Sequence, residues 1–452
     1  MSAILSPAVP NEVVPIATPP SATGAPAYYR FKPWNVGRIV IWSLFALMLI
    51  AAPHVFTSSL ALTMLSQMGY AIIICLSYNI LLGQGGMLSF GHAVYTGLGS
   101  IRAMNRAAEG ALPIPLVLIP VVGGLAGMFF AALLGWVTTK KSGTTFAMIT
   151  LGVGELVASM ALMFPGFFGG EGGITTDRVY GQPFLGFDFG PGIQVYYLIA
   201  VYCFVCTALM FAFTGTPLGR MLNAVRDNPE RVAFVGYNPQ RVRYMGFVVA
   251  GFFAGVGGGL AAINFEIVTA MDSVSILRSG SYLLFTFLGG ATFFFGPIIG
   301  GVLMVIATVF LSELTKAWML YLGLIFLFMV MYAPGGIASL IMLNLRLAKY
   351  GKLGRIVWAY LPLAGTALVM TLGVAAMVEM IYHLQLNSAL GAELRFLGMT
   401  LHVRSAESWL GAVAVFLTGL GLFELTRRAY LRQWHQIQET IAREIERGEA
   451  TA

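Results

Sequence analysis

Charge is scarce in this sequence of 452 residues. Only 10% of them are Asp, Glu, Lys or Arg, whereas 58% are hydrophobic, and the mean hydropathy is +0.81. A soluble domain carries about 25% charged residues, so this composition excludes a water-soluble globular protein. The formal net charge is +7, but membrane proteins collect Lys and Arg on one side of the bilayer. Nucleic-acid binding is therefore not indicated.

Cysteine is also rare. The three cysteines, Cys75, Cys203 and Cys206, lie in apolar runs, which excludes a disulfide scaffold. Cys203 and Cys206 share a C-x-x-C spacing, but no His or acidic residue stands nearby, so packing is favoured over redox chemistry or metal binding. The five histidines are scattered, whereas integral membrane enzymes usually cluster His, Asp or Cys near one membrane face. We therefore predict neither a catalytic centre nor a metal site.

Long apolar runs fill most of the chain. Because about 20 apolar residues cross the hydrocarbon core as a helix, we expect twelve candidate spans near 38–57, 58–82, 86–102, 114–137, 143–165, 192–214, 244–266, 280–292, 296–313, 317–334, 357–382 and 409–425. Three of these (86–102, 280–292 and 317–334) are short or interrupted by glycine, so nine to twelve could cross. The predicted fold class is an all-α integral membrane protein, a polytopic bundle of about 10–12 transmembrane or partly spanning helices.

The basic residues predict an orientation. With the N-terminus in the cytoplasm and twelve crossings, 19 of the 26 Lys and Arg residues fall on the inner side and seven on the outer side. This bias agrees with the positive-inside rule and predicts that both termini are cytoplasmic.

Composition divides the chain into four predicted parts. Residues 1–37 hold seven of the 20 prolines and no secretory signal pattern, so a disordered cytoplasmic tail is expected. Residues 38–345 form the main transmembrane domain, and 346–425 form an extension with two more spans. Residues 426–452 form a cytoplasmic amphipathic tail, because Trp434, Ile437, Ile441 and Ile445 recur at steps of three or four.

The segment 216–243 differs from the other connections. It carries five basic and two acidic residues, together with apolar residues on one side: Met221, Leu222, Val225, Val232 and Val235. Asn228-Pro229 predicts a break between two short helices, and Gly236 predicts the end of the second. We interpret this segment as a compact two-helix element that docks into a partner. The alternative is an ordinary interfacial amphipathic segment.

Other polar residues within the apolar runs are candidates for a translocation pathway. Glu155 is placed near mid-bilayer, where an ionised carboxylate is costly and usually faces a polar interior; it could equally be a hydrogen-bonded or protonated packing residue. Asn79, Gln84, Ser89 and His92 lie in a glycine-rich segment that predicts a broken helix, the kind of element with which transporters meet polar solutes. His92 could instead be a packing histidine with satisfied hydrogen bonds.

Glycines recur at every fourth position in residues 251–259, namely at Gly251, Gly255 and Gly259. Small residues at this spacing allow two helices to approach closely. We predict that these glycines pack a helix, either within the chain or against a partner.

Five stretches occur together in a recognisable order. They are Asn79–His92 (NILLGQGGMLSFGH), Gly143–Glu155 (GTTFAMITLGVGE), the 216–243 segment, Gly289–Gly301 (GGATFFFGPIIGG) and Ala333–Ile337 (APGGI). In these stretches, over roughly residues 38–345, the chain resembles the permeases of ABC importers of the branched-chain amino-acid type. The glycine-rich loop Gly169–Ile174 resembles the LivM-type subunit rather than its LivH-type partner.

The resemblance implies a role for the 216–243 segment as the loop that couples the permease to its ATPases. The coupling residues implied are Gly219, Arg220, Leu222, Ala224, Val225, Arg226, Asp227, Asn228, Glu230, Ala233 and Gly236. Arg226, Asp227 and Glu230 would make polar rim contacts, and Leu222 and Val225, together with the neighbouring Val232, would be apolar anchors.

The resemblance also implies the partners and the cellular location. A LivH-type permease, two ABC ATPases and a periplasmic solute-binding protein would assemble with this chain in the lipid of the bacterial inner membrane. The chain itself would bind no cofactor, since it lacks the phosphate-binding pattern G-x-x-x-x-G-K-[ST], and the ATPases would use ATP and Mg²⁺. Branched-chain amino acids are the default substrate, with urea, amides and aromatic acids as further options.

Two features depart from the family pattern. Gly335 stands where the family usually has an arginine, and the chain continues for over a hundred residues beyond the matching part. One other class of function stays open on the residues alone, an ion-gradient-driven secondary transporter that uses Glu155 as proton carrier. The remaining rival, an integral membrane enzyme, is disfavoured by the scattered histidines.

Overall fold

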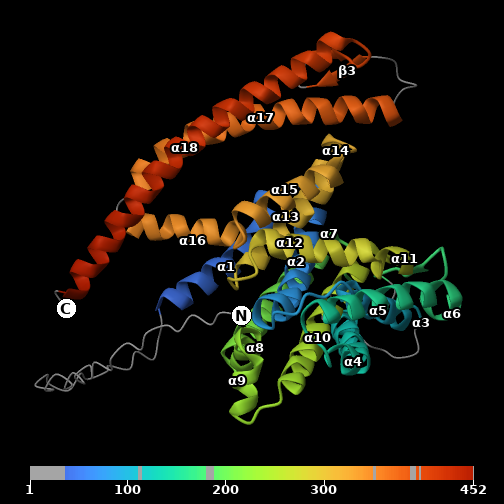
Figure 1. Ribbon diagram of the computed structural model, residues 1–452. Helices are drawn as coiled ribbons and strands as arrows, with labels where there is room; N and C mark the ends of the chain where they lie inside the picture. The colour runs from blue at the N-terminus through green and yellow to red at the C-terminus, as the bar shows by residue number, and fades with distance from the viewer. Residues whose placement is uncertain are drawn as a thin grey trace, which may run out of the picture. The chain divides into compact units, whose positions relative to one another are not determined.

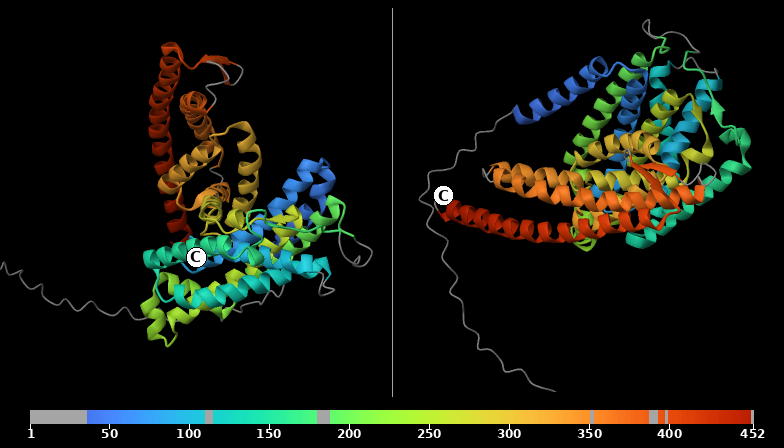
Figure 2. Two further views of the ribbon diagram at one scale, coloured as in Figure 1. Left: turned by 90° about the vertical axis from the view of Figure 1, so that its right-hand side faces the viewer. Right: turned by 90° about the horizontal axis from the view of Figure 1, so that it is seen from above.

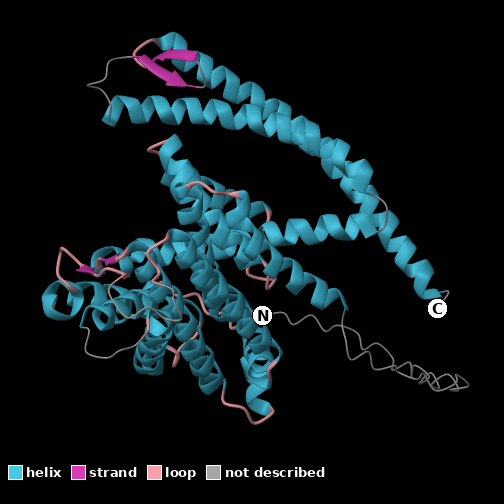
Figure 3. Ribbon diagram, turned by 180° about the vertical axis from the view of Figure 1, so that it is seen from behind, coloured by secondary structure: helices cyan, strands magenta, loops and turns pink. Residues whose placement is uncertain are grey.

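The computed structural model describes residues 36–109, 115–179, 188–349, 353–386, 393–396 and 399–450. Helices make up nearly all of this part, as Figure 3 shows. Eight of them are long and apolar enough to cross a membrane, within 36–55, 59–84, 116–138, 143–163, 192–215, 239–265, 358–385 and 406–434. The predicted all-α polytopic class is confirmed. The predicted tail 1–37 lies outside the described residues except for its last two, which are helical.

The order of elements is shown in Figures 1 and 2. Those of the first half are α1 (Val36–Val55), α2 (Ser59–Asn79), η1 (Ile80–Gln84), α3 (His92–Glu109), η2 (Leu116–Leu118), α4 (Ile119–Thr138), α5 (Gly143–Met163), α6 (Pro165–Phe168), β1 (Ile174–Thr175), α7 (Gly192–Gly215), α8 (Pro217–Asp227) and α9 (Pro229–Phe234). The remaining elements are α10 (Pro239–Phe265), β2 (Ile267–Val268), α11 (Ala270–Ser273), α12 (Ile276–Gly289), α13 (Gly296–Ile306), η3 (Ala307–Leu311), α14 (Ser312–Leu314), α15 (Trp318–Tyr332), α16 (Gly336–Lys349), α17 (Leu353–Leu386), β3 (Glu393–Phe396), β4 (Met399–His402) and α18 (Ala406–Ala450).

Four predicted spans differ from the observed helices. Residues 86–102 start as non-helical chain and become helical only at His92, and 280–292 corresponds to α12, a helix of 14 residues. Residues 296–313 form a short apolar helix, and 317–334 belongs to a pair, α15 and α16, bent by 48°. Counted by length and composition, the described residues thus hold eight spans, or nine with the bent pair. Glycine and proline shorten or bend these four segments.

The core of the 48–452 unit is built around α10, which packs on α2, α3 and α4. Gly251, Gly255 and Gly259 face α4 of the same chain: a Cβ on Gly255 would lie 2.9 Å from the carbonyl carbon of Gly123, and one on Gly259 would lie 2.9 Å from Cα of Pro120. Of the two options left by the sequence, the structure therefore places this stripe inside the chain. Close backbone contact between two helices requires glycine at these positions.

The predicted break after α2 is present. The helix changes into the π-helical turn η1, and the chain leaves it at Gly86, whose φ is +62°. The amides of Gly86 and Met87 donate to the carbonyls of Leu82 and Leu81, at 3.1 and 2.9 Å. Residues 87–91 are not helical, and α3 begins at His92. A π-turn and a left-handed glycine together end the helix without leaving these amides unpaired.

The C-terminal extension is a long helical hairpin. Helices α17 and α18 lie side by side, and the short antiparallel pair β3–β4 stands between them in sequence (Figure 2). Gly373 and Gly419 lie where the two helices approach closely. A Cβ on Gly373 would lie 2.6 Å from the backbone nitrogen of Phe416, and one on Gly419 would lie 2.5 Å from that of Met370. The predicted boundaries at 345/346 and 425/426 fall inside α16 and α18, so each of these helices is continuous across a predicted boundary.

Candidate functional site

The segment after α7 folds into the two short helices that the sequence predicts. The Thr216 hydroxyl accepts a hydrogen bond from the amide of Gly219 at 3.2 Å, and the Asn228 side chain accepts from the amide of Arg231 at 2.9 Å. Proline follows each cap at the first helical position. Cap-proline pairs start a helix in a fixed direction, and Gly236, with φ +93°, ends the element.

The apolar side of this element faces its own chain. Leu222, Val225 and Val232 are 0–4% exposed, and the Leu222 side chain lies directly over Gly246 of α10. The expectation that these three residues are apolar anchors for a partner therefore disagrees with the structure, in which they are covered. Their burial holds the element rigidly against the bundle, because buried aliphatic side chains pack at the density of a crystal.

Other apolar residues of the element are free of such cover. Phe234 is 89% exposed, Val235 70% and Tyr237 52%, and they follow one another at the end of α9. Asp227 and Glu230 are also exposed, as are Arg220, Ala233 and Gly236. The sequence did not single out Phe234, because this residue lies in α9, outside the apolar periodicity of α8.

Two polar contacts join α8 to the π-turn η1. The Arg226 guanidinium donates to the carbonyl of Gly83 and also pairs with the Asp227 carboxylate, with 3.0 Å between Nη2 and Oδ1. The Asn223 side-chain amide donates to Oε1 of Gln84 at 2.6 Å. A Cβ on Gly86 would lie 2.7 Å from Cγ of Arg226, so glycine is needed for this approach. A shift of α8 would therefore displace η1.

The other polar residues of the 79–92 stretch are buried beside η1. The His92 Nε2 lies 2.9 Å from the Ser77 hydroxyl, and the Tyr78 hydroxyl donates to the carbonyl of Ser89 at 2.7 Å. Asn79, Ser89 and His92 are 0–2% exposed. Within the described residues, Oδ1 of Asn79, Oγ of Ser89 and Nδ1 of His92 have no hydrogen-bond partner. Of the five predicted pathway residues, these three and the half-buried Gln84 lie close together.

Glu155 does not join this group. It lies on α5 and is exposed, although the preceding Gly154 packs near Gly91. Exposed residues flank it on the same face of the helix, among them Met148 at 73% and Leu162 at 54%. An ionised carboxylate in the middle of an apolar helix is costly in lipid, so this face is suited to a protein neighbour or to a polar pathway.

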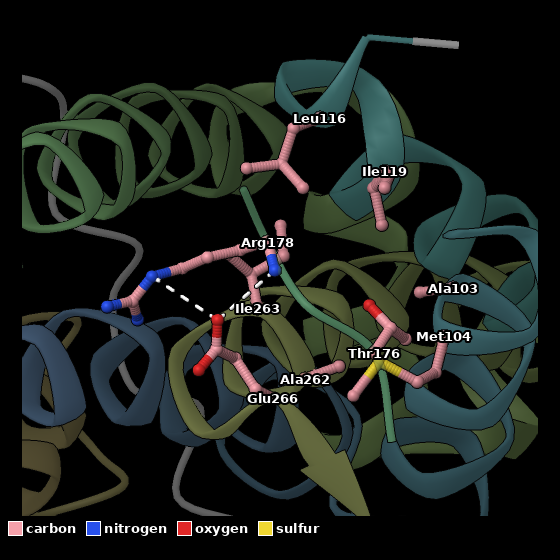
Figure 4. A pocket seen from close by; sticks show the side chains of 9 residues that line it. All are labelled: Ala103, Met104, Leu116, Ile119, Thr176, Arg178, Ala262, Ile263 and Glu266. Carbon is pink, nitrogen blue, oxygen red and sulfur yellow. Dashed lines mark hydrogen bonds and ion pairs between the residues drawn. The ribbon is translucent and has the colours of Figure 1, made fainter. Parts of the chain in front are cut away.

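A second polar feature lies at the other end of α10. Glu266 ends this helix in the left-handed conformation, with φ +56°. Its carboxylate accepts from the backbone amide of Arg178 at 3.1 Å and pairs with the guanidinium at 3.5 Å, and Figure 4 shows these side chains beside a small pocket. Its carbonyl accepts from Thr176 next to the β1–β2 pair. The contact joins residues 88 positions apart, so no local pattern in the sequence indicates it.

Within the described residues, no group of three or more His, Cys, Asp or Glu side chains could hold a metal ion. The described polar residues of α8 and η1 join these two elements through hydrogen bonds. The arrangement is suited to mechanical coupling between helices.

Comparison with known proteins gives a consistent result. A family model described as the branched-chain amino acid transport system / permease component matches residues 60–334. The high-affinity branched-chain amino acid transport system permease protein LivM of Salmonella typhimurium is 26% identical over 299 residues, which is 61% of this chain and 69% of the relative. LivM of Escherichia coli is 25% identical over 299 residues, which again cover 61% of this chain and 69% of the relative.

A further relative is the galactose/methyl galactoside import permease protein MglC of Haemophilus influenzae. It is 25% identical over 282 residues, which cover 57% of this chain and 78% of the relative. No solved structure matches.

Proposed function

The chain belongs to the family of branched-chain amino acid transport system permease components, and we propose that its exposed α8–α9 element is where ATPase subunits drive it. It is a membrane-spanning subunit of an ABC importer for branched-chain amino acids or related solutes, a multi-pass protein of the bacterial cytoplasmic membrane. It is a transport component rather than an enzyme.

One observation supports the coupling role most directly. The α8–α9 element is buried against the chain through Leu222, Val225 and Val232, exposes Phe234 at 89%, and is tied to η1 through Arg226. An element that transmits force must be rigid on its inner side and accessible on its outer side. A rigid-body displacement there would be passed to α2 and α3 through η1.

The remaining subunits complete this proposal. Two ABC ATPases use ATP and Mg²⁺ and close beneath the element, so that this chain needs no nucleotide of its own. A periplasmic binding protein delivers the solute. A LivH-type permease covers the exposed face of α5 around Glu155, since an uncovered carboxylate at that place is costly in lipid.

The secondary-transporter alternative has less support. A proton carrier driven by an ion gradient would need Glu155 to be enclosed together with polar partners, yet this residue is exposed on α5. The α8–α9 element would also have no purpose in such a transporter.

The experiment reverses charge on the exposed side of the element. Asp227→Lys combined with Glu230→Lys should weaken association with the ATPases and reduce ATP-dependent uptake of radiolabelled leucine in reconstituted vesicles, because both carboxylates are exposed rim groups. Glu439→Lys, an exposed carboxylate on α18, is the matched control. Membrane insertion should be unchanged in all variants, and normal uptake by a well-inserted double variant would refute the coupling role.

A further inference from the structure

A cavity of about 350 Å³ lies between α2, α3, α10, α11 and α12. Its volume falls in the range of about 300–1,000 Å³ that is typical of small-molecule sites. Polar side chains reach it from four of these helices: Tyr70, Thr96, Ser100, Asp272, Arg278 and Tyr282. None of them was assigned a role from the sequence.

Two opposite charges stand at this cavity. The Arg278 guanidinium in the first turn of α12 pairs with the Asp272 carboxylate of α11. The Arg278 side chain is 33% exposed and that of Asp272 is 64% exposed, so the arginine lies deeper. The backbone here is fixed, since the amide of Arg278 donates to the Ser275 hydroxyl at 3.2 Å.

Buried hydroxyl groups line the same cavity. Tyr70 and Tyr282 are 8% and 6% exposed, and both line the cavity. The Ser100 hydroxyl is committed to the carbonyls of Thr96 and Gly258, at 2.9 and 2.8 Å, and joins α3 to α10 at the wall. The polar part of the cavity is therefore held in place by contacts that do not require a ligand.

Apolar side chains also line the cavity. Ile74, Phe265 and Val268 line it, and Phe265 makes an edge-to-face contact with Tyr70 at 6.2 Å between ring centroids. The cavity thus offers one cation, one anion and an aliphatic surface within the space of a small molecule.

We propose that this cavity binds an α-amino acid as its zwitterion. The Arg278 guanidinium binds the carboxylate of the amino acid, because a guanidinium group can donate two parallel hydrogen bonds to a carboxylate. Asp272 takes the ammonium group, and the aliphatic side chain lies among Ile74, Phe265 and Val268. The proposal rests on the proposed transport function and names its solute class: urea, amides and aromatic acids lack one or both of the charges that the ion pair would exchange.

The cavity is connected to the buried polar group beside η1. The residue after Arg278 is Ser279, whose hydroxyl accepts a hydrogen bond from the amide of Ala93 at 3.0 Å. Ala93 follows His92 in the first turn of α3. A solute that repositions Arg278 would therefore act on the helix that also contacts α2 through His92 and Ser77.

The test measures binding to the purified full-length chain in lipid nanodiscs by titration calorimetry. The probes are L-leucine, 4-methylpentanoate without the ammonium group, 3-methylbutylamine without the carboxylate, and urea. We expect leucine to bind and each analogue to bind about a hundredfold more weakly, because a missing partner leaves a charge of the site unpaired.

Variants locate the binding to this cavity. Arg278→Gln and Asp272→Asn should each abolish measurable leucine binding, whereas Arg428→Gln, which breaks an exposed pair with Glu424, should leave it unchanged. Binding of the anion or of urea as tightly as leucine would overturn the zwitterion assignment. Absence of leucine binding to the folded wild-type chain, or leucine binding that survives Arg278→Gln, would overturn the site.

Uptake separates this proposal from the proposed function. If reconstituted vesicles take up leucine in an ATPase-dependent manner and Arg278→Gln does not change the rate, the site fails and the importer role stands. If uptake by the wild type persists without ATPases, the proposed function fails, whatever the calorimetry shows.

Discussion

Arg226 makes the most consequential single contact of the candidate site. Its guanidinium reaches from α8 to the carbonyl of Gly83, in a turn where the α-helical hydrogen-bond pattern is interrupted. The stem of the side chain lies over Gly86, which only a residue without Cβ permits. A charged donor on a backbone carbonyl forms a strong hydrogen bond, worth about 1.5–3 kcal/mol, and this one spans the joint between two elements.

The first prediction concerns this contact. Arg226→Ala should leave ATP hydrolysis by the assembled transporter intact but lower uptake per ATP hydrolysed by about tenfold, since about 1.4 kcal/mol of coupling is lost. Parallel measurement of phosphate release and leucine uptake in proteoliposomes tests it. Lys141→Ala, an exposed basic residue after α4, serves as the control. Unchanged stoichiometry in Arg226→Ala would show that η1 does not receive the motion through this residue.

The second prediction concerns Gly255 at the α4–α10 contact. A Cβ there would overlap the carbonyl oxygen of Gly123 and lie 2.9 Å from its carbonyl carbon and 3.0 Å from Cα of Gly124, so the helices must separate. Gly255→Ala should therefore lower stability by about 1–3 kcal/mol net, despite the gain in helix propensity. Thermal unfolding in detergent measures this. Gly421→Ala on α18 has open space around the new methyl group and should not lower the melting temperature; equal behaviour of the two variants would contradict the close packing.

At the scale of elements, α8 and α9 combine a covered side with an uncovered end. Exposed aromatic residues at the end of a short helix are suited to a partner groove, and aromatic anchors dominate binding at many interfaces. The exposed tip of Phe234, Val235 and Tyr237 has this composition. The charged residues around it set orientation and rate of association rather than affinity.

The third prediction follows from this tip. Phe234→Ala should weaken binding of the ATPase subunits by about thirtyfold, the loss of a typical 2 kcal/mol hot spot. Pull-down titration of the ATPases onto the permease complex in nanodiscs measures the affinity. Phe129→Ala on α4 removes another exposed aromatic ring, 62% exposed, at a different place and is the control. Equal affinity of Phe234→Ala and the wild type would exclude the tip as the anchor.

The sequence predicts those elements whose signals are local. Asn228-Pro229 and Gly236 mark the bounds of α8 and α9, and the Gly-rich stretch marks the break at η1, because capping and left-handed glycines act within a few residues. The sequence did not reveal what packs against the apolar face of this element. An amphipathic pattern shows that one face is apolar, but not whether that face packs on the same chain or on a partner.

Contacts between distant residues escaped the sequence reading for the same reason. Arg226 and Gly83 are 143 positions apart, and the cavity brings together Tyr70, Ser100 and Arg278. The short strands β1 and β2 pair across about 90 residues, and each holds only two residues. No periodicity reports such pairings, since they depend on how α2, α3, α10 and α12 pack.

At the scale of the whole chain, the family match and the extra helices occupy different residues. The match ends at residue 334, whereas α17 and α18 pack mainly on each other and have a small hydrophobic core of their own: Ala376, Met380, Val403 and Ala412. Polar contacts back to the matched part include those of Glu379, which accepts hydrogen bonds from the hydroxyls of Thr315 and Tyr321. This arrangement is that of an attached hairpin rather than of an inserted part.

The last prediction tests the hairpin by removing it. A chain that ends at residue 349 should insert into the membrane and, assembled with its partners, retain most of the ATPase-dependent leucine uptake, because the α4–α10 core and the α8–α9 element lie before the cut. Glu379→Gln in the full chain is the companion variant: it keeps the hairpin and weakens only the link, so its uptake should also stay close to that of the wild type. Loss of uptake in both would show that the hairpin acts on transport through Glu379, whereas loss in the truncated chain alone would show that the hairpin itself is part of the transporting unit.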